Sequence, residues 1–186
     1  MIKVYVKYLD NKERSYQKLH DAAWSMLHHA VYSHTGSDFT DEDIIRGEKG
    51  KPYFRSIPLH FGISHCDGCA VCAISDTPIG ADCETIRKFK QRTAEKSFTS
   101  SELALISGSD EMLSRLWSLK ESYVKFTGTG LAGHFNDVIF SSAEEYPQAE
   151  YIFSGRLYFR SIFLNGIFIS VCSEQKTENI EILTAL

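Results

Sequence analysis

Residues 59–84 read LHFGISHCDGCAVCAISDTPIGADCE, and three consecutive β-strands are predicted within this stretch. Apolar residues dominate 59–64 and 69–75, and a short turn at 65–68 separates these two runs. Short apolar runs that are bounded by turn residues are typical of strands joined as a hairpin. Pro78 then begins a third short strand, IGADCE. The stretch therefore predicts a small antiparallel sheet in the middle of the chain.

Helices are predicted on both sides of these strands. Residues 18–32 contain no helix breaker and repeat their apolar residues at helical spacing, which is typical of a helix with one core-facing side. Thr99 and Glu102 fit a capping box, so a short helix is expected at 102–106. A longer helix is expected at 110–126, where two glycines follow the last apolar residue.

The two ends of the chain add further β-structure. Residues 2–9 alternate in polarity, and residues 135–182 hold several short β-type runs separated by Ser, Gly, Asn and Pro. One helical turn is expected at 41–45. Helices interleaved with antiparallel hairpins indicate the α+β class.

The composition is that of an ordinary globular protein. The chain has 186 residues, of which 43% are hydrophobic and 24% charged, so disorder, collagen and coiled coil are excluded for the chain as a whole. The length suits one domain or two small halves packed together. The sequence contains no run of about 18 apolar residues, so it predicts no transmembrane helix. The N-terminal stretch has no apolar signal core. We therefore expect a cytoplasmic protein that has no membrane association.

The net charge of −4 argues against a general nucleic-acid binder, which is normally basic. Residues 87–96, RKFKQRTAEK, nevertheless carry five basic residues and one acidic residue. This basic stretch has two interpretations, a docking surface for an acidic partner or the solvated face of a helix.

The five cysteines raise the question of a metal or iron–sulfur cluster. Cys66, Cys69 and Cys72 form C-x-x-C-x-x-C, but no fourth cysteine follows within 73–77. The segment CAVCAIS is instead typical of a buried strand, since free cysteine is among the most buried residue types. The odd number of cysteines indicates free thiols in a reducing compartment.

Two groups of residues have the spacing of a catalytic site. Asp82 and Glu84 lie two apart on a predicted strand, so both carboxylates project from one face and suit a hard cation such as magnesium. Trp117, Glu121 and Lys125 lie along one face of the predicted long helix. Each group also has a plain interpretation, a solvent-facing strand edge for the first and a surface ion pair for the second.

Three further residues are candidates for binding a phosphate. Ser64 and His65 stand at a predicted strand end, and Lys51 lies in a Gly-Lys-Pro turn. A hydroxyl, an imidazole and an ammonium can contact phosphate oxygens. The alternative for all three is a role in capping or shaping turns.

The order of these motifs is more specific than any one of them. The chain reads GKPYF, FGISHCDGCAVCAIS, PIGADCE, FTSSE and LWSLKESYVKFTGTGL in succession. This succession, over residues 50–131, resembles the signature of the 4′-phosphopantetheinyl transferase superfamily. The length resembles the long, Sfp-type subclass, in which two similar α+β halves form a monomer. The resemblance implies halves at 1–76 and 77–186 with the active site at their junction.

The resemblance also implies an activity and a set of roles. Family members transfer the 4′-phosphopantetheine group of coenzyme A to a serine of an apo acyl or peptidyl carrier protein and release 3′,5′-ADP. The matching positions imply magnesium ligands at Asp82, Glu84 and Glu121. Glu121 is also the candidate general base, and Lys125 and Lys120 match the lysines of the helix motif. Lys51, Ser64 and His65 match positions that bind coenzyme A.

Some positions depart from the family pattern. Cys66 stands where serine is usual, and Ala81 and Cys83 replace bulkier aliphatic residues around Asp82. The N-terminal half is poor in basic residues, and Arg14 and Lys18 are the candidates for the 3′-phosphate of coenzyme A. Two alternatives remain: a non-catalytic member of the same fold that binds coenzyme A or a carrier protein, and a redox protein with a cysteine cluster.

Overall fold

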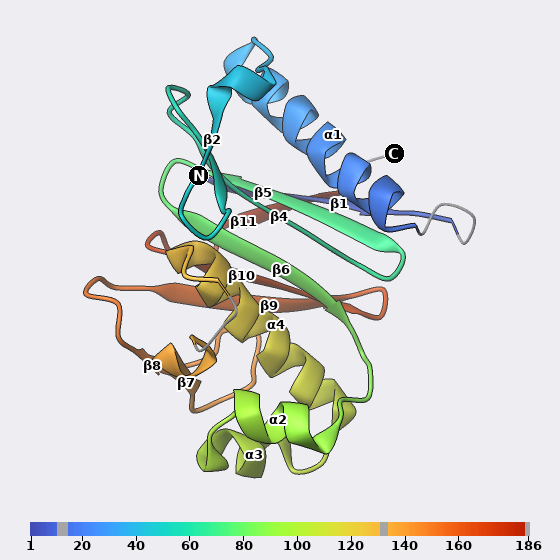
Figure 1. The fold of residues 1–186 in the computed structure, drawn as a ribbon, viewed down its shortest axis with the longest axis vertical. Coiled ribbons are helices and arrows are strands. Elements are labelled where there is room, and N and C mark those ends of the chain that lie inside the picture. Colours follow the sequence, from blue (N-terminus) through green and yellow to red (C-terminus); the bar gives the residue numbers. More distant parts are fainter. Residues whose placement is uncertain (11–14, 131–133, 185–186) are drawn as a thin grey trace.

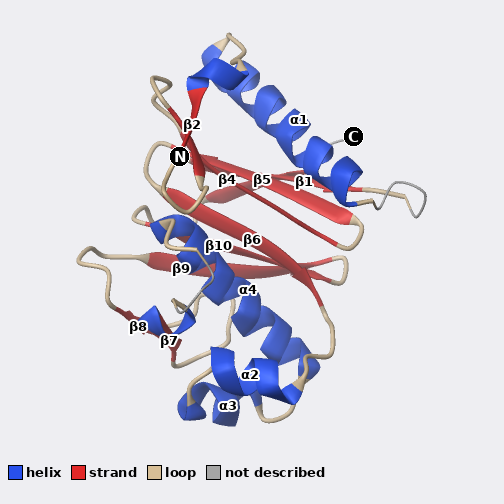
Figure 2. Ribbon diagram, in the orientation of Figure 1, coloured by secondary structure: helices blue, strands red, loops and turns tan. Residues whose placement is uncertain are grey.

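Two β-sheets lie face to face between two long helices in this computed structural model, which describes residues 1–10, 15–130 and 134–184 (Figure 1). The first sheet has the strand order β11-β1-β5-β4 and the second has the order β6-β10-β9. Helix α1 packs on the first sheet and helix α4 on the second, so the layers run helix, sheet, sheet, helix (Figure 2). The strands of the first sheet are β1 (Ile2–Tyr8), β4 (His60–Cys66), β5 (Cys69–Ser75) and β11 (Ile180–Thr184).

The second sheet and the helices complete the layers. The strands of the second sheet are β6 (Ile79–Thr85), β9 (Tyr158–Leu164) and β10 (Ile167–Ser173). The helices are α1 (Tyr16–Thr35), α2 (Gln91–Ser97), α3 (Ser100–Ile106) and α4 (Asp110–Thr127), with the short 3₁₀ turns η2 (Asp41–Asp43) and η3 (Phe135–Asp137). Two-stranded ladders join β2 (Ile44–Arg46) to β3 (Pro52–Phe54) and β7 (Val138–Phe140) to β8 (Ala149–Tyr151).

The same succession of elements occurs twice along the chain. A strand, a long helix, a two-stranded ladder and a hairpin follow one another as β1, α1, β2–β3 and β4–β5, and again as β6, α4, β7–β8 and β9–β10. In both cases the first strand pairs antiparallel with the last. The α+β class is therefore confirmed. The division at residue 76 stays a prediction, and β11 from the end of the chain pairs with β1 in the first sheet.

The fully apolar sequence of β5 follows from its place between two layers. Ala70, Cys72 and Ile74 face the core under α1, whereas Val71 and Ala73 face the core between the two sheets. A strand that is buried on both faces reads as a continuous apolar run. The prediction that CAVCAIS is a buried strand is confirmed, and the five cysteines are free thiols.

The helices begin and end where the sequence signals indicate. The Ser15 hydroxyl accepts a hydrogen bond from the Lys18 backbone N–H at the start of α1, and Gly36 closes that helix in the left-handed region. The capping box between Thr99 and Glu102 is confirmed at the start of α3. Helix α4 ends at Gly128, where the φ angle of +72° favours glycine.

Two expectations differ from the structure. The helical turn expected at 41–45 is confined to Asp41–Asp43, because the next three residues pair with β3 as strand β2. The parallel pairing of β11 with β1 was not predicted, since it joins the two ends of the chain. Within the described residues, no helix is long and apolar enough to cross a membrane.

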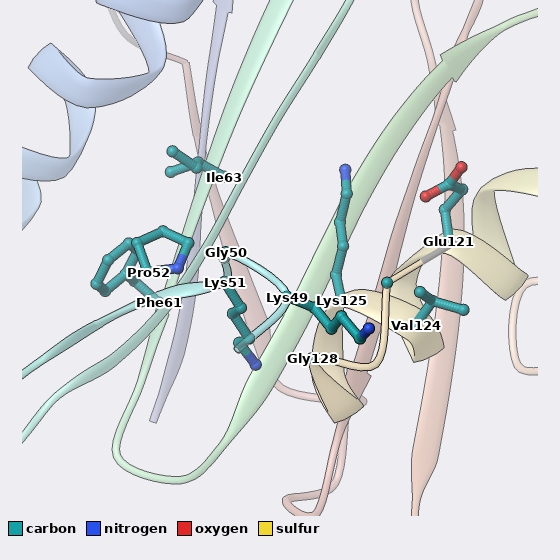
Figure 3. A pocket seen from close by; sticks show the side chains of 12 residues that line it. Lys49, Gly50, Lys51, Pro52, Phe61, Ile63, Glu121, Val124, Lys125 and Gly128 are labelled. Atoms are coloured by element: carbon teal, nitrogen blue, oxygen red, sulfur yellow. The ribbon is translucent and has the colours of Figure 1, made fainter. Parts of the chain in front are cut away.

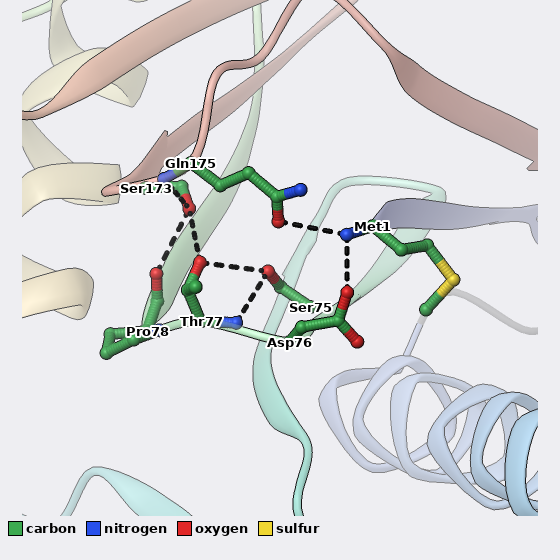
Figure 4. A network of polar contacts seen from close by, with 7 residues as sticks. All are labelled: Met1, Ser75, Asp76, Thr77, Pro78, Ser173 and Gln175. Atoms are coloured by element: carbon green, nitrogen blue, oxygen red, sulfur yellow. Dashed lines mark hydrogen bonds and ion pairs between the residues drawn. The ribbon is translucent and has the colours of Figure 1, made fainter.

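A polar network holds the short connection between the two sheets (Figure 4). The Ser173 hydroxyl donates a hydrogen bond to the Pro78 carbonyl at 3.1 Å, and the Thr77 backbone N–H donates to the Ser75 hydroxyl at 3.2 Å. The amino group of Met1 pairs with the Asp76 carboxylate at 2.5 Å. These contacts fix the point where the chain leaves β5 and enters β6.

Helix α4 lies directly on the backbone of β6 at Gly80. A Cβ atom at Gly80 would lie 2.1 Å from the Ser122 carbonyl oxygen and 2.3 Å from the Phe126 nitrogen. Strands β4 and β6 also approach closely, because a Cβ at Gly62 would lie 2.8 Å from the Ala81 nitrogen. Only glycine permits these contacts. Gly80 brings α4 onto β6, and Gly62 brings β4 close to β6.

The Gly80→Ala variant is expected to lose about 2–4 kcal/mol of unfolding free energy, because the added methyl group must push α4 away from β6. Urea denaturation measures this loss. Gly47→Ala is the control, since a Cβ there meets the Tyr53 ring at an ordinary 3.6 Å. Equal stabilities of the two variants would contradict the close approach.

Candidate active site

Three polar side chains from three elements meet at the junction of the two sheets. Asp82 of β6 accepts a hydrogen bond from the Ser64 hydroxyl of β4 at 2.8 Å. The Lys125 ammonium of α4 contacts the same Asp82 oxygen at 2.6 Å and donates to the Ser64 oxygen at 2.8 Å. Burial disfavours the charge on Lys125, but attraction to Asp82 outweighs it and raises the lysine pKa. The sequence prediction that these residues belong to one site is consistent with this geometry.

Glu121 lies one helical turn before Lys125 and is 9% exposed. Its carboxylate makes no hydrogen bond or ion pair with any described residue. Burial, together with repulsion from Asp82 and Glu84, raises the pKa of Glu121 to about 7, although Lys125 acts in the opposite direction. A carboxyl group that titrates near neutral pH can accept a proton from a substrate hydroxyl.

Glu84 points to the same side of β6 as Asp82, as the alternation of the strand requires. Its carboxylate pairs with the Arg87 guanidinium at 2.9 Å. Arg87 also stacks on the Phe89 ring, with 4.0 Å between the guanidinium carbon and the ring centroid. The sequence analysis did not single out Arg87 as a site residue, although it lies three residues after Glu84.

A cleft of about 270 Å³ opens between the G-K-P turn, β4 and the end of α4 (Figure 3). Lys49, Lys51 and Lys125 line it together with Glu121. Because these three lysines outnumber the one acidic residue in the lining, the cleft favours an anionic ligand. Lys49 was missed by the sequence analysis, although it lies only two residues before Lys51.

The G-K-P turn and the G-T-G segment meet in this cleft. Gly128 lies under the side chain of Lys51, and Gly130 lies under that of Lys49. The Lys51 ammonium donates a hydrogen bond to the Phe126 carbonyl at 2.8 Å, at the end of α4. Burial lowers the pKa of Lys51 to about 8. The Lys51 side chain therefore caps a carbonyl at the end of α4 and forms part of the cleft wall.

His65 lies beside a smaller cavity of about 190 Å³, which it lines with Ser64, Lys125 and His20. Burial lowers the pKa of His65, and the nearby Lys125 lowers it further. The ring of Tyr16 packs edge-on against His65 at 4.9 Å. His20 was not a predicted site residue, and only the fold brings α1 to this position.

The structure does not bring Lys120 to the cleft. Its side chain is fully buried, and its ammonium pairs with Glu102 at 2.8 Å and donates to the Phe135 and Val138 carbonyls. Lys120 thus ties α3 and the segment after the glycine loop to α4. The predicted catalytic role finds no substrate-facing geometry here, because Lys120 projects from a different side of α4 than Glu121 and Lys125.

The predicted magnesium ligands are near one another but not gathered. Asp82 is held by Lys125 and Glu84 by Arg87, and no group of three side chains in the described residues has the arrangement of a metal site. The donor chemistry nevertheless fits a hard cation, since three carboxylates influence one another's charge and Glu121 has no partner among the described side chains. A cation would relieve the repulsion that raises the pKa of Glu121.

The candidates for the 3′-phosphate are only partly described. Arg14 lies outside the described residues, and Lys18 is in the first turn of α1. Their roles therefore stay predictions. The basic stretch at 87–96 forms a linker and helix α2, with Lys88, Lys90 and Arg92 exposed.

The fold is of the α+β class, and lysines line a cleft beside the buried Glu121. A sequence model of the 4′-phosphopantetheinyl transferase superfamily matches residues 78–175. The chain belongs to this superfamily. The matched segment contains Asp82, Glu84, Glu121 and Lys125.

Individual relatives agree with this assignment. The chain is 37% identical over 91 residues to 4′-phosphopantetheinyl transferase gsp of Aneurinibacillus migulanus. This match covers 46% of the present chain and 38% of the relative. The chain is also 36% identical over 91 residues to 4′-phosphopantetheinyl transferase Sfp of Bacillus subtilis, covering 46% and 41%. These matches span well under half of each relative's length.

A yeast relative matches over a longer region. The L-aminoadipate-semialdehyde dehydrogenase-phosphopantetheinyl transferase of Saccharomyces cerevisiae is 28% identical over 162 residues, which covers 74% of this chain and 58% of that protein.

The Glu121→Gln variant is expected to gain stability over the wild type as pH rises. The folded-state pKa of about 7 lies above the ordinary value of 4.5, so folding favours the protonated acid, and the wild type loses stability between these values. Urea denaturation in a chelator should show a difference that grows by about 2–3 kcal/mol from pH 5 to pH 8. Glu150→Gln, which removes an exposed carboxylate, is the control. Parallel pH profiles for wild type and Glu121→Gln would contradict the buried charge.

The Lys120→Met variant is expected to lose about 3–5 kcal/mol of unfolding free energy, because it leaves the Glu102 carboxylate buried without its cation. Adding Glu102→Gln should recover at least about 1 kcal/mol, since the pair is coupled. Denaturant unfolding measures both changes, with the exposed Lys176→Met as the control. A loss no larger than that of the control would show that the ion pair does not hold these elements together.

Proposed function

We propose that this protein transfers the 4′-phosphopantetheine group of coenzyme A to a serine hydroxyl of an apo acyl or peptidyl carrier protein and releases 3′,5′-ADP. The observation that carries the proposal is the contact of Asp82, Ser64 and Lys125 beside the carboxyl group of Glu121. Of these residues, Glu121 and Lys125 line the cleft together with Lys49 and Lys51. The names of the relatives support the same reaction.

Asp82, Glu84 and Glu121 are proposed to hold Mg²⁺. When bound, this ion neutralises charge on the pyrophosphate of coenzyme A during phosphoryl transfer. Asp82 and Glu84 already have cationic partners, Lys125 and Arg87, in the structure. Burial and repulsion from its neighbours favour the neutral form of Glu121.

The remaining cleft residues bind and orient the substrate. Lys125 and Lys49 offset the negative charge of the phosphates, and Lys51 fixes the cleft wall through the end of α4. Ser64 and His65 line the adjoining cavity, where a hydroxyl and an imidazole can bind a phosphate of coenzyme A.

Glu121 is proposed to take the proton from the carrier serine. The serine oxygen then forms a bond to the phosphorus on the pantetheine side of the pyrophosphate. The bond from this phosphorus to the bridging oxygen breaks, and 3′,5′-ADP leaves with that oxygen. Glu121 takes this proton directly or through a water molecule.

The setting of this reaction is also a proposal. A monomer in the cytoplasm fits the five free thiols, which suit a reducing compartment, and the two halves that share one cleft within a single chain. The alternative function, a non-catalytic protein that binds coenzyme A or a carrier, shares the fold and the cationic cleft. Only a transfer assay separates the two.

The decisive assay incubates the protein with coenzyme A, Mg²⁺ and an apo carrier protein, and follows the mass of the carrier. The wild type should add the 4′-phosphopantetheine mass, and Glu121→Gln and Asp82→Asn should slow the transfer by about 10²-fold or more. Glu150→Gln, with the same change of charge at an exposed site, should transfer normally. A wild type that binds coenzyme A but modifies no fatty-acid, polyketide or peptide-synthetase carrier would favour the non-catalytic alternative.

The exposed cations of the basic stretch are proposed to dock the carrier, because carrier proteins of this family are acidic. Reversing Lys88, Lys90 and Arg92 to Glu should raise KM for the carrier, leave KM for coenzyme A unchanged, and weaken the dependence of KM on salt. Reversal of Arg55, Arg156 and Lys176, which are exposed elsewhere, is the matched control. An unchanged KM for the carrier would exclude this surface.

A further inference from the structure

Three of the five thiols meet behind the carboxylates of the site. Cys66, the last residue of β4, is paired in register with Cys69, the first residue of β5. Cys83 of β6 lies in the same buried cluster as Cys69, and Cys66 packs against that cluster. The paired Cys66 and Cys69 side chains project to the same face of the hairpin, toward this cluster. The function proposed above gives these thiols no role.

The position of Cys83 connects this thiol cluster to the site. Cys83 lies between Asp82 and Glu84 on β6, and its side chain projects to the opposite face of the strand. Cys66 lies two residues after Ser64 on β4. A change in how the three thiols pack therefore acts on the two strands that carry Ser64 and the acidic residues.

The pairing of Cys66 with Cys69 meets the distance requirement of a disulfide. Directly opposed residues of antiparallel strands have Cα atoms about 4.5–5.5 Å apart, and disulfides occur at Cα separations of about 4.4–6.8 Å. Cys66 is also the only one of the five cysteines that is not buried. Of the pair, Cys66 is therefore the residue at which attack on a small oxidant would begin.

We propose that Cys66 and Cys69 form an oxidative modification site, a dithiol that closes to a disulfide at the end of the β4–β5 hairpin. With a low-molecular-weight disulfide as the oxidant, the Cys66 sulfur attacks one of its sulfur atoms and releases one small thiol. The Cys69 sulfur then attacks Cys66, forms the internal disulfide and releases the second small thiol. The protein loses two electrons and two protons, and the small disulfide gains them.

The disulfide changes the surroundings of Cys83. Oxidation draws the Cys66 and Cys69 sulfurs to bonding distance, so the buried cluster that contains Cys83 must repack. Cys83 is then left buried beside a disulfide, and β6 must adjust at the position between Asp82 and Glu84. If the proposed transfer reaction is correct, its rate should fall on oxidation and return on reduction.

Mass spectrometry tests the modification site without any activity assay. The full-length protein is incubated with glutathione disulfide, denatured, and treated with iodoacetamide. Reduced protein should take up a carbamidomethyl group at each of its five cysteines, whereas oxidised protein should take up three and show a 66–69 crosslink after proteolysis. Cys66→Ser and Cys69→Ser should abolish the crosslink, and Cys172→Ser should keep it.

Two results would overturn the proposal. One is full alkylation of all five cysteines after prolonged oxidation, and the other is a crosslink that joins a different pair. Loss of transfer activity that dithiothreitol restores in the wild type but that is absent in Cys69→Ser would support the effect on the site. If the crosslink forms in a protein that transfers nothing, the modification site stands while the proposed function fails.

Discussion

The contact between α4 and β6 at Gly80 is the constraint on which the site depends. With no side chain at this position, the backbone of the helix rests on the backbone of the strand. Asp82, two residues further along the same face of β6, then lies within reach of Lys125. Gly62 has a matching effect on the other side, because it lets β4 approach β6 and brings Ser64 to Asp82.

Charge balance governs what this arrangement can bind. Asp82 and Glu84 are each paired with a cation, whereas Glu121 is buried and has no partner among the described residues. Its raised pKa reflects burial and the neighbouring carboxylates. These carboxylates favour a bound cation, whereas the three lysines that line the cleft favour a bound anion. A ligand that combines phosphates with a divalent cation would satisfy both groups, which is why the proposed reaction fits this cleft.

Much of the fold could be predicted from local signals. The buried strand β5, the helix at Asp110–Thr127 and the capping box at Thr99 follow from apolar runs, helical spacing and cap residues within a few positions. The pairing of β11 with β1 could not, since nothing local records a partner some 180 residues away. The same limit explains why His20 of α1 was missed beside His65.

The candidate site was predictable in its types of residue more than in its contacts. The alternation of β6 placed Asp82 and Glu84 on one face, and helical spacing placed Glu121 beside Lys125. The spacing also separated Lys120 from them, but only the packed structure shows that Lys120 pairs with Glu102 in the core. Arg87 was counted as part of a basic stretch, whereas its guanidinium neutralises Glu84.

Calorimetric titration of coenzyme A in Mg²⁺ and in a chelator tests the central claim, that the junction of the halves binds phosphates together with a divalent cation. The account predicts that at pH 8 Mg²⁺ tightens coenzyme A binding. In Asp82→Asn, this gain in affinity should be smaller by about tenfold or more. The Glu150→Gln control should keep the gain. Equal affinity with and without Mg²⁺, or a gain that survives Asp82→Asn, would contradict the account.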